Sequence, residues 1–80
     1  MNVRLLFFGI AKDLVQLDDV YFELPNNATV AVFKSRLLDI FPQLTNLNSY
    51  FIAVNESYAN DDTILNENDE VAILPPVSGG

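Results

Sequence analysis

The chain contains no cysteine and no histidine, and both absences narrow the chemistry that it can perform. Without cysteine there is no disulfide framework, no thiolate nucleophile and no cysteine-ligated metal, and the lack of disulfides fits a reducing compartment. Without histidine the chain lacks the commonest general base near neutral pH and the commonest metal ligand. Acid–base catalysis would be left to carboxylates, lysines and tyrosines.

Basic residues are also scarce, because four lysines and arginines accompany eleven aspartates and glutamates and give a net charge of -7. A chain of this charge repels phosphate backbones and anionic lipid surfaces, so we expect neither a nucleic acid nor a membrane as a partner. A protein partner guided by electrostatic attraction should be basic.

Long apolar runs are absent as well, since none approaches the roughly 20 residues needed to span a bilayer. At 80 residues, half of them hydrophobic, the chain is expected to form one small domain with a single core. Together with the missing cysteines, this composition predicts a cytoplasmic protein.

The apolar pattern predicts four strands, at residues 3–8, 20–24, 50–54 and 71–74. The first strand is apolar on both faces, which is typical of a buried central strand. A short helix is expected over residues 10–15. The clearest helix starts at the N-cap Thr29, ends at Pro42 and carries an apolar stripe at three- and four-residue spacings, made of Val30, Phe33, Leu37, Ile40 and Phe41.

This order of elements favours an α+β fold in which a mixed sheet of about four to five strands packs on one main helix. The first and last strands are expected to lie side by side at its centre. Pro75 and Pro76 cannot donate to a strand ladder, so the sheet should stop there and the chain should leave in an extended form. We therefore expect a folded domain over residues 1–75 and a flexible tail over residues 76–80.

The tail ends on two glycines, Gly79 and Gly80. Gly80 has no Cβ, so its carboxylate could pass through a narrow channel and be approached from either side, and Gly79 lets the backbone turn freely. Such an end is well suited to activation and transfer. The simpler alternative is a loose terminus without a role.

Five segments of the chain combine into one recognisable pattern. They are Leu6-Phe7-Phe8, Thr29-Val30, Ala53-Val54-Asn55, Asp69-Glu70-Val71 and Pro75-Pro76-Val77-Ser78-Gly79-Gly80. Together they resemble the small, sulfur-carrying subunit of molybdopterin synthase, and the resemblance covers essentially the whole chain. The tail motif is its most specific part.

The resemblance implies a ubiquitin-like β-grasp fold and a chain that is non-catalytic alone. It implies that a partner enzyme adenylates the Gly80 carboxylate with ATP and converts it to a thiocarboxylate. The tail then enters the active site of a large synthase subunit, in a heterotetramer, and the sulfur passes to cyclic pyranopterin monophosphate. A thiocarboxylate is a soft, ionised nucleophile at neutral pH, so sulfur chemistry can proceed on a chain without a thiol.

The resemblance also implies which residues contact the partner. Phe8, Tyr58 and Leu74 match positions where the family places apolar residues against the large subunit, although each could equally be an ordinary sheet residue. The inserted tail would contribute the remaining contacts, through Pro75, Pro76, Val77 and Ser78.

Other readings of the sequence stay open. A related β-grasp carrier for thiamine or tRNA thiolation, or a ubiquitin-like modifier, would use the same diglycine. A plain protein-interaction module with an incidental tail is a further alternative.

Other polar residues are expected to be structural. The acidic residues do not follow the spacing of a calcium loop, so we expect solvated turns and no metal site. The Asp18-Asp19 pair is interpreted as hairpin surface and not as a catalytic pair, and Asn55 as a turn residue. No GxGxxG or phosphate loop is present, so we expect the chain itself to bind no ATP and no other cofactor.

Overall fold

The structure is a computed structural model that describes residues 1–46 and 50–75. Five strands and two α-helices make up the fold, and a short 3-10 helix, Pro42–Asn46, follows the second α-helix. In chain order they are β1 (Asn2–Phe7), α1 (Gly9–Val15), β2 (Asp19–Glu23), α2 (Val30–Ile40), β3 (Phe51–Val54), β4 (Ser57–Tyr58) and β5 (Glu70–Leu74).

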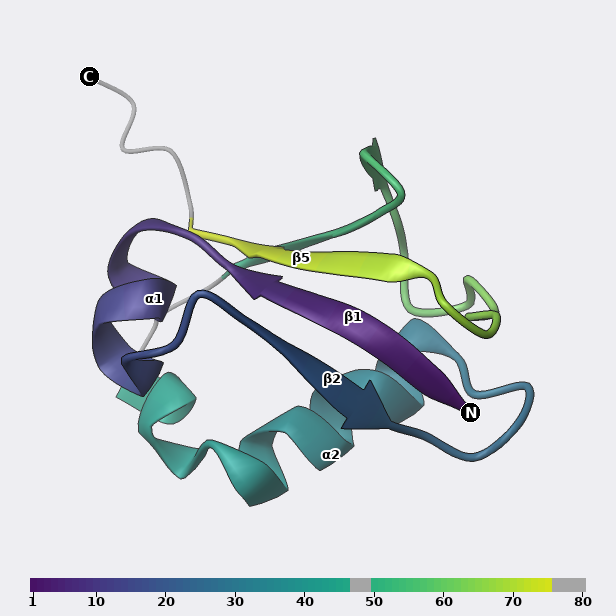
Figure 1. The fold of residues 1–80 in the computed structure, drawn as a ribbon, viewed down its shortest axis with the longest axis horizontal. Coiled ribbons are helices and arrows are strands. Elements are labelled where there is room, and N and C mark those ends of the chain that lie inside the picture. The colour runs from purple at the N-terminus through teal and green to yellow at the C-terminus, as the bar shows by residue number, and fades with distance from the viewer. Residues whose placement is uncertain (47–49, 76–80) are drawn as a thin grey trace.

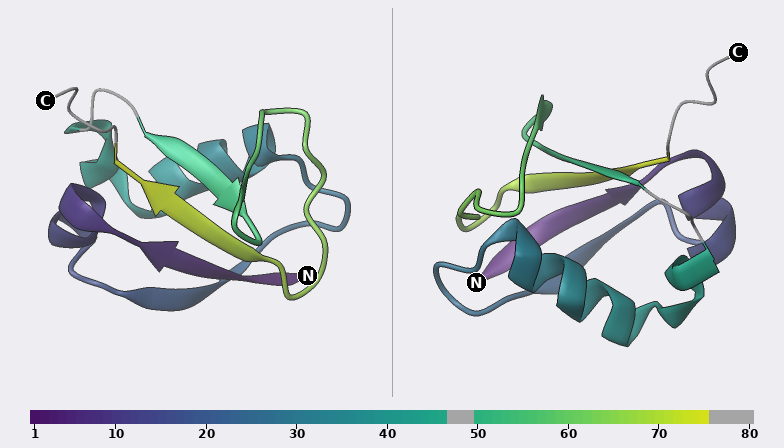
Figure 2. Two further views of the ribbon diagram at one scale, coloured as in Figure 1. Left: turned by 90° about the horizontal axis from the view of Figure 1, so that it is seen from above. Right: turned by 180° about the vertical axis from the view of Figure 1, so that it is seen from behind.

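The strands form one mixed sheet in the order β2-β1-β5-β3-β4. The pair of β1 and β5 is parallel, and the other three pairs are antiparallel. Both helices lie on the same side of the sheet, which leaves the opposite face uncovered (Figures 1 and 2). The expected α+β architecture and the pairing of the first and last strands are confirmed.

The two faces of β1 differ in how deeply their side chains are buried. Val3, Leu5 and Phe7 are buried against the helices, whereas Leu6 is half-buried and Phe8 is 47% exposed. The expectation of a strand buried on both faces is therefore wrong, because no element within residues 1–46 and 50–75 covers the outer face of the sheet. The strand also ends one residue early, since Phe8 already serves as the N-cap position of α1.

α2 begins as its sequence predicts, with the Thr29 hydroxyl accepting a hydrogen bond from the Val32 amide at 3.3 Å. Phe33 packs edge-on against Phe22 of β2, with 5.4 Å between ring centroids. Ile40 is 58% exposed, so its place in the buried stripe was predicted wrongly.

The reason lies in the C-terminal end of α2. The helix stops at Ile40, and the chain turns at Phe41 into the 3-10 helix. Phe41 then packs edge-on against Phe7, with 5.4 Å between ring centroids, and Leu44 is buried. Phe41 and Leu44 thus close this end of the core, and Ile40 is left exposed on the last turn of α2.

The hairpin of β3 and β4 contains the strand that the sequence did not predict. Asn55 and Glu56 both have positive φ, 50° and 73°, as a tight two-residue hairpin turn requires. Ser57 and Tyr58 then form β4. Two residues are too few to show an alternating pattern, so propensity could not reveal this strand.

Asn55 is a turn residue, as expected, and its side chain makes further contacts. Its amide nitrogen donates to Asp69 Oδ1 at 2.9 Å, and its side-chain oxygen accepts from the Glu70 amide at 2.9 Å. Asn55 therefore ties the hairpin to the start of β5, in addition to shaping its own turn. Neither helix among the described residues combines the length and apolar character needed to cross a membrane.

Candidate functional site

The predicted site residues divide into a described group and a group outside the described residues. Phe8, Tyr58, Leu74 and Pro75 are described. The remaining predicted site residues, Pro76, Val77, Ser78, Gly79 and Gly80, lie outside the described part of the chain. The expected boundary between a domain ending at residue 75 and a tail stays a prediction.

A groove crosses the uncovered face of the sheet, and its shape follows from one row of paired residues. Leu6 lies opposite Ala72, Ala72 lies opposite Ala53, and Ala53 lies opposite Tyr58. Residues directly opposite each other in a sheet share a face, so this row crosses four strands on one side. The two alanines in the middle leave a hollow between larger neighbours.

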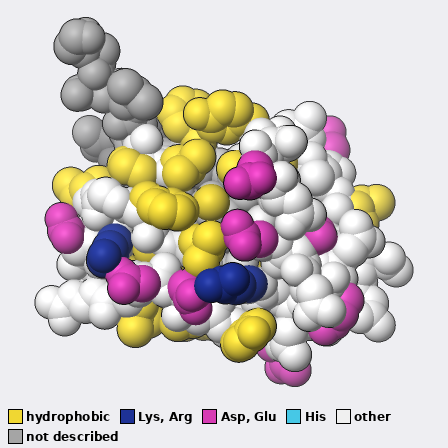
Figure 3. All heavy atoms as spheres, turned by 45° about the horizontal axis from the view of Figure 1, so that its top comes forward, with side chains coloured by type: hydrophobic (Ala, Val, Ile, Leu, Met, Phe, Trp, Pro, Cys, Tyr) yellow, Lys and Arg dark blue, Asp and Glu magenta, His cyan; other side chains and the backbone are white. Residues whose placement is uncertain are grey.

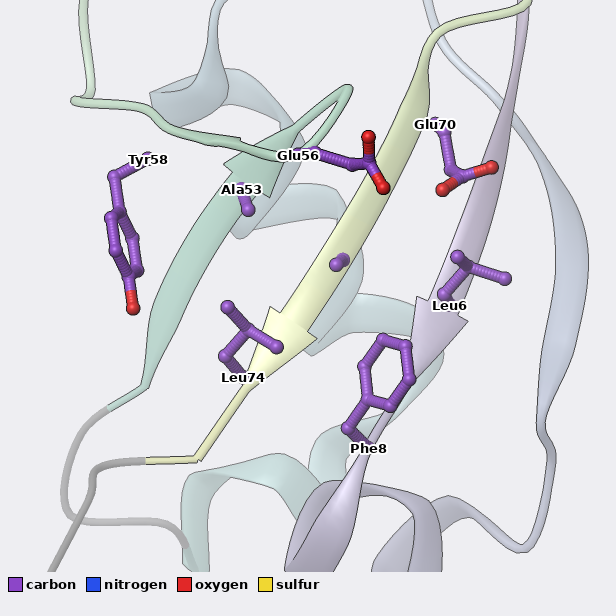
Figure 4. Close-up of a pocket in the computed structure, with 8 residues that line it drawn as sticks. Leu6, Phe8, Ala53, Glu56, Tyr58, Glu70 and Leu74 are labelled. Atoms are coloured by element: carbon purple, nitrogen blue, oxygen red, sulfur yellow. The ribbon is translucent and has the colours of Figure 1, made fainter.

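The groove brings together the three apolar residues predicted to contact a partner. Phe8, Tyr58 and Leu74 all line it, and its volume is about 300 Å³ (Figure 4). Phe8 and Leu74 stand at the end where β1 and β5 finish, beside the base of the tail. Tyr58 stands across the groove on β4 and is 76% exposed. Residues from both ends of the chain and from the hairpin thus form one surface.

Sequence reasoning missed further members of this surface. Leu6, Ala53 and Ala72 line the groove, and Phe51 packs edge-on against Tyr58 with 5.9 Å between ring centroids. Phe51 is 49% exposed and lies opposite Leu74. Strand alternation could have found them, because Leu6 precedes Phe8 by two positions and Ala72 precedes Leu74 by two.

The groove is apolar at the end near the tail and acidic at the other end. Glu56 and Glu70 line this far end, and hydrophobic and acidic side chains lie next to each other on this face (Figures 3 and 4). Glu70 Oε2 is 3.8 Å from Arg4 Nη1, whereas no described residue forms an ion pair with Glu56. The far end therefore suits a basic side chain of a partner.

Arg4 offsets only part of this acidic charge. Its Nη2 donates to Asp19 Oδ2 at 2.7 Å, and this bond, with the charge of Asp19, raises the pKa of the Arg4 guanidinium above its ordinary value. Asp18 pairs separately with Lys12 at 2.6 Å. The two neighbouring aspartates thus pair with different basic side chains on the surface, in agreement with the predicted structural role.

Three further acidic residues also have structural partners. Asp61 Oδ1 accepts from Lys34 Nζ at 2.8 Å, Glu67 accepts from the Asn2 amide, and Asp69 Oδ2 accepts from the Asn66 amide at 2.8 Å. Within residues 1–46 and 50–75, no group of three or more acidic side chains is arranged to hold a metal ion. These carboxylates stabilise turns, as the sequence predicted.

Comparison with known proteins shows which family the sequence matches. The model of the ThiS family matches residues 5–80. The molybdopterin synthase sulfur carrier subunit of Dictyostelium discoideum is 36% identical, over 96% of this chain and 94% of that protein. The protein of the same name from Arabidopsis thaliana is 33% identical, over 100% of this chain and 84% of that protein.

Solved structures agree on the fold. SAMP1 from Haloferax volcanii superposes with a TM-score of 0.87 at 21% identity over 100% of both chains, which shows a ubiquitin-like β-grasp fold. A chain in the complex of subunits 1 and 2 of the molybdopterin-converting factor from Helicobacter pylori is 26% identical, with a TM-score of 0.72, again over 100% of both chains.

Proposed function

The chain belongs to the ThiS family, and on this basis we propose that it is the sulfur carrier subunit of molybdopterin synthase. The observation that carries the proposal is the full-length similarity to relatives of that name, combined with the diglycine that ends the sequence. An apolar groove beside the base of the tail supports it, because a carrier must dock before its end can react.

The reacting group in this proposal is the carboxylate of Gly80. On a separate activating enzyme this carboxylate attacks the α-phosphate of ATP, which releases pyrophosphate and forms an acyl-adenylate. A sulfide equivalent supplied by that enzyme then attacks the acyl carbon, and AMP leaves. The product is a thiocarboxylate, whose sulfur is a nucleophile at neutral pH. Gly79 and Gly80 present it without side chains that would obstruct a narrow channel.

The second partner is the large catalytic subunit of the synthase, in a complex with two copies of each chain. The groove lined by Phe8, Tyr58 and Leu74 would receive apolar side chains of that subunit. Pro75, Pro76, Val77 and Ser78 would lead the thiocarboxylate into its active site. The thiocarboxylate sulfur attacks a side-chain carbon of cyclic pyranopterin monophosphate and displaces an oxygen substituent there, and hydrolysis of the acyl–sulfur bond restores the Gly80 carboxylate. Two such transfers supply the two sulfurs of the dithiolene.

In this scheme the chain binds no cofactor or metal itself, since ATP is consumed on the activating enzyme and the pterin lies in the large subunit. It works in the cytoplasm, where both partners are expected. The chain supplies a reactive group and a docking surface, and its partners supply the catalytic side chains.

Reconstitution with a large subunit tests the proposal. Thiocarboxylated full-length chain should convert the pterin precursor to the dithiolene product, and a chain lacking Gly80 should give no product while unfolding at the same temperature, because an end segment adds little to the core. Product from the truncated chain would contradict the assignment of Gly80. Transfer to a thiazole or tRNA acceptor, but not to the pterin, would favour the related carriers.

A further inference from the structure

Gly9 is the first residue of α1 and has a positive φ of 57°, a conformation that residues with a side chain rarely adopt. It lies against Pro75, the first residue after β5. A Cβ added to Gly9 would be 2.8 Å from Pro75 Cγ and 3.6 Å from Pro75 Cδ. The ring of Pro75 therefore occupies the space that a side chain at position 9 would need.

This contact cannot be relieved by rotating a side chain. Ordinary contact begins near 3.4 Å, so a distance of 2.8 Å requires a movement of about 0.6 Å. The ring of a proline is closed onto its own backbone nitrogen, so Cγ can move only within the limits of ring pucker, and a larger displacement moves the backbone as well. The neighbouring amide of Phe8 donates to the Ile73 carbonyl at 3.3 Å and holds the ends of β1 and β5 together.

The same two short segments form the wall of the groove. Phe8 directly precedes Gly9, and Leu74 directly precedes Pro75, while Phe8 and Leu74 both line the groove. The contact of Gly9 with Pro75 thus lies between the proposed docking surface and the start of the proposed reactive segment. A partner that docks in the groove would therefore lie beside the point where the chain leaves the sheet, and the Gly9–Pro75 contact would fix the direction of the chain at that point.

We propose that Gly9 is a positioning residue for sulfur transfer. Because Gly9 has no side chain, the Pro75 ring can pack against its Cα, and this contact fixes the direction in which the backbone leaves Pro75 toward Gly80. This inference rests on the proposed function. A misplacement on the order of 1 Å at a reacting centre can cost about 100-fold in rate.

The test compares Gly9→Ala, Pro75→Ala and the double variant in the reconstituted synthase at a temperature at which all of them are folded. Gly9→Ala should slow single-turnover sulfur transfer at saturating large subunit by about tenfold or more, with affinity for the large subunit within about twofold of wild type. Pro75→Ala removes the ring and should cost only about threefold. In the double variant the strained φ of residue 9 remains but the clash is gone, so its rate should return to that of Pro75→Ala.

A double variant as slow as the product of the two single losses would overturn the inference, since the ring would then not be the cause. So would a Gly9→Ala chain that transfers sulfur at the wild-type rate. A direct readout is the nuclear Overhauser effect between the Gly9 α-protons and the Pro75 ring protons, and its absence in wild type would also overturn the inference. If the wild-type chain shows this nuclear Overhauser effect but transfers no sulfur, the proposed function is wrong, although the contact between Gly9 and Pro75 is real.

Discussion

Ala72 of β5 lies directly opposite Ala53 of β3, and these two methyl groups form the floor of the groove on the uncovered face of the sheet. Larger residues surround them on all sides. The hollow therefore exists because two neighbouring strands place their smallest side chains in the same row.

Filling the floor should block docking without unfolding the domain. Ala72→Leu adds three carbons on the open side of the sheet, where nothing in the described chain opposes them. We expect affinity for the large subunit to fall at least about tenfold, equivalent to about 1.4 kcal/mol, as measured by calorimetry. The thermal midpoint should change by only a few degrees. Unchanged affinity would show that the partner docks elsewhere.

Two tyrosines of equal exposure provide a matched pair. Tyr58 is 76% exposed and lines the groove, whereas Tyr21 is 77% exposed on β2, outside the groove. Tyr58→Ala should weaken binding of the large subunit by about 2 kcal/mol, because aromatic residues at the centre of an interface carry much of its energy. Tyr21→Ala should leave binding within about twofold. Equal losses for the two variants would contradict the placement of the interface.

The acidic end of the groove should speed association with the partner. Glu56→Lys reverses a charge that has no ion-pair partner among the described residues, so binding should slow several-fold at low salt and lose part of its salt dependence. Glu23→Lys makes the same change in net charge on β2 and serves as the control. Stopped-flow association rates at two ionic strengths give the answer. If both variants slow equally, net charge and not the groove is responsible.

The sequence predicted the elements whose patterns are long, and the structure corrects those whose patterns are short. The adjacency of β1 and β5 was expected from two strongly apolar strands, although their parallel direction was not predicted, and Thr29 with Pro42 marked the ends of α2 to within two residues. β4 has only two residues, and the exposure of Ile40 depends on a turn at Phe41 that spacing alone does not reveal.

The site was predictable only in part for a related reason. Phe8, Tyr58 and Leu74 were named from the resemblance, but the groove depends on register, which aligns Leu6, Ala72 and Ala53 across three strands. Register results from the pairing of distant segments, so a single strand cannot show it. The contact of Gly9 with Pro75 is also long-range and left no local signal.

Alkaline pH should destabilise the fold partly through Tyr50. Burial raises the pKa of its hydroxyl, with Lys34 opposing the shift and Asp61 adding to it. The folded chain then holds this proton more tightly than the unfolded chain, so stability present below about pH 10 is lost as pH rises through the folded pKa. In Tyr50→Phe, urea unfolding measured across this pH range should show a shallower loss of stability than in wild type. Identical slopes for wild type and Tyr50→Phe would contradict this expectation.

The central claim is that Gly80 carries sulfur, and the intact mass of the chain tests it most directly. After incubation with its activating enzyme, ATP and a sulfide source, the chain should gain about 16 Da, the difference between sulfur and oxygen, as expected for a thiocarboxylate. Fragmentation should place the gain on Gly80, and omission of ATP should abolish it. An unchanged mass with an activating enzyme that loads a related carrier in parallel, or a gain placed on another residue, would contradict the claim.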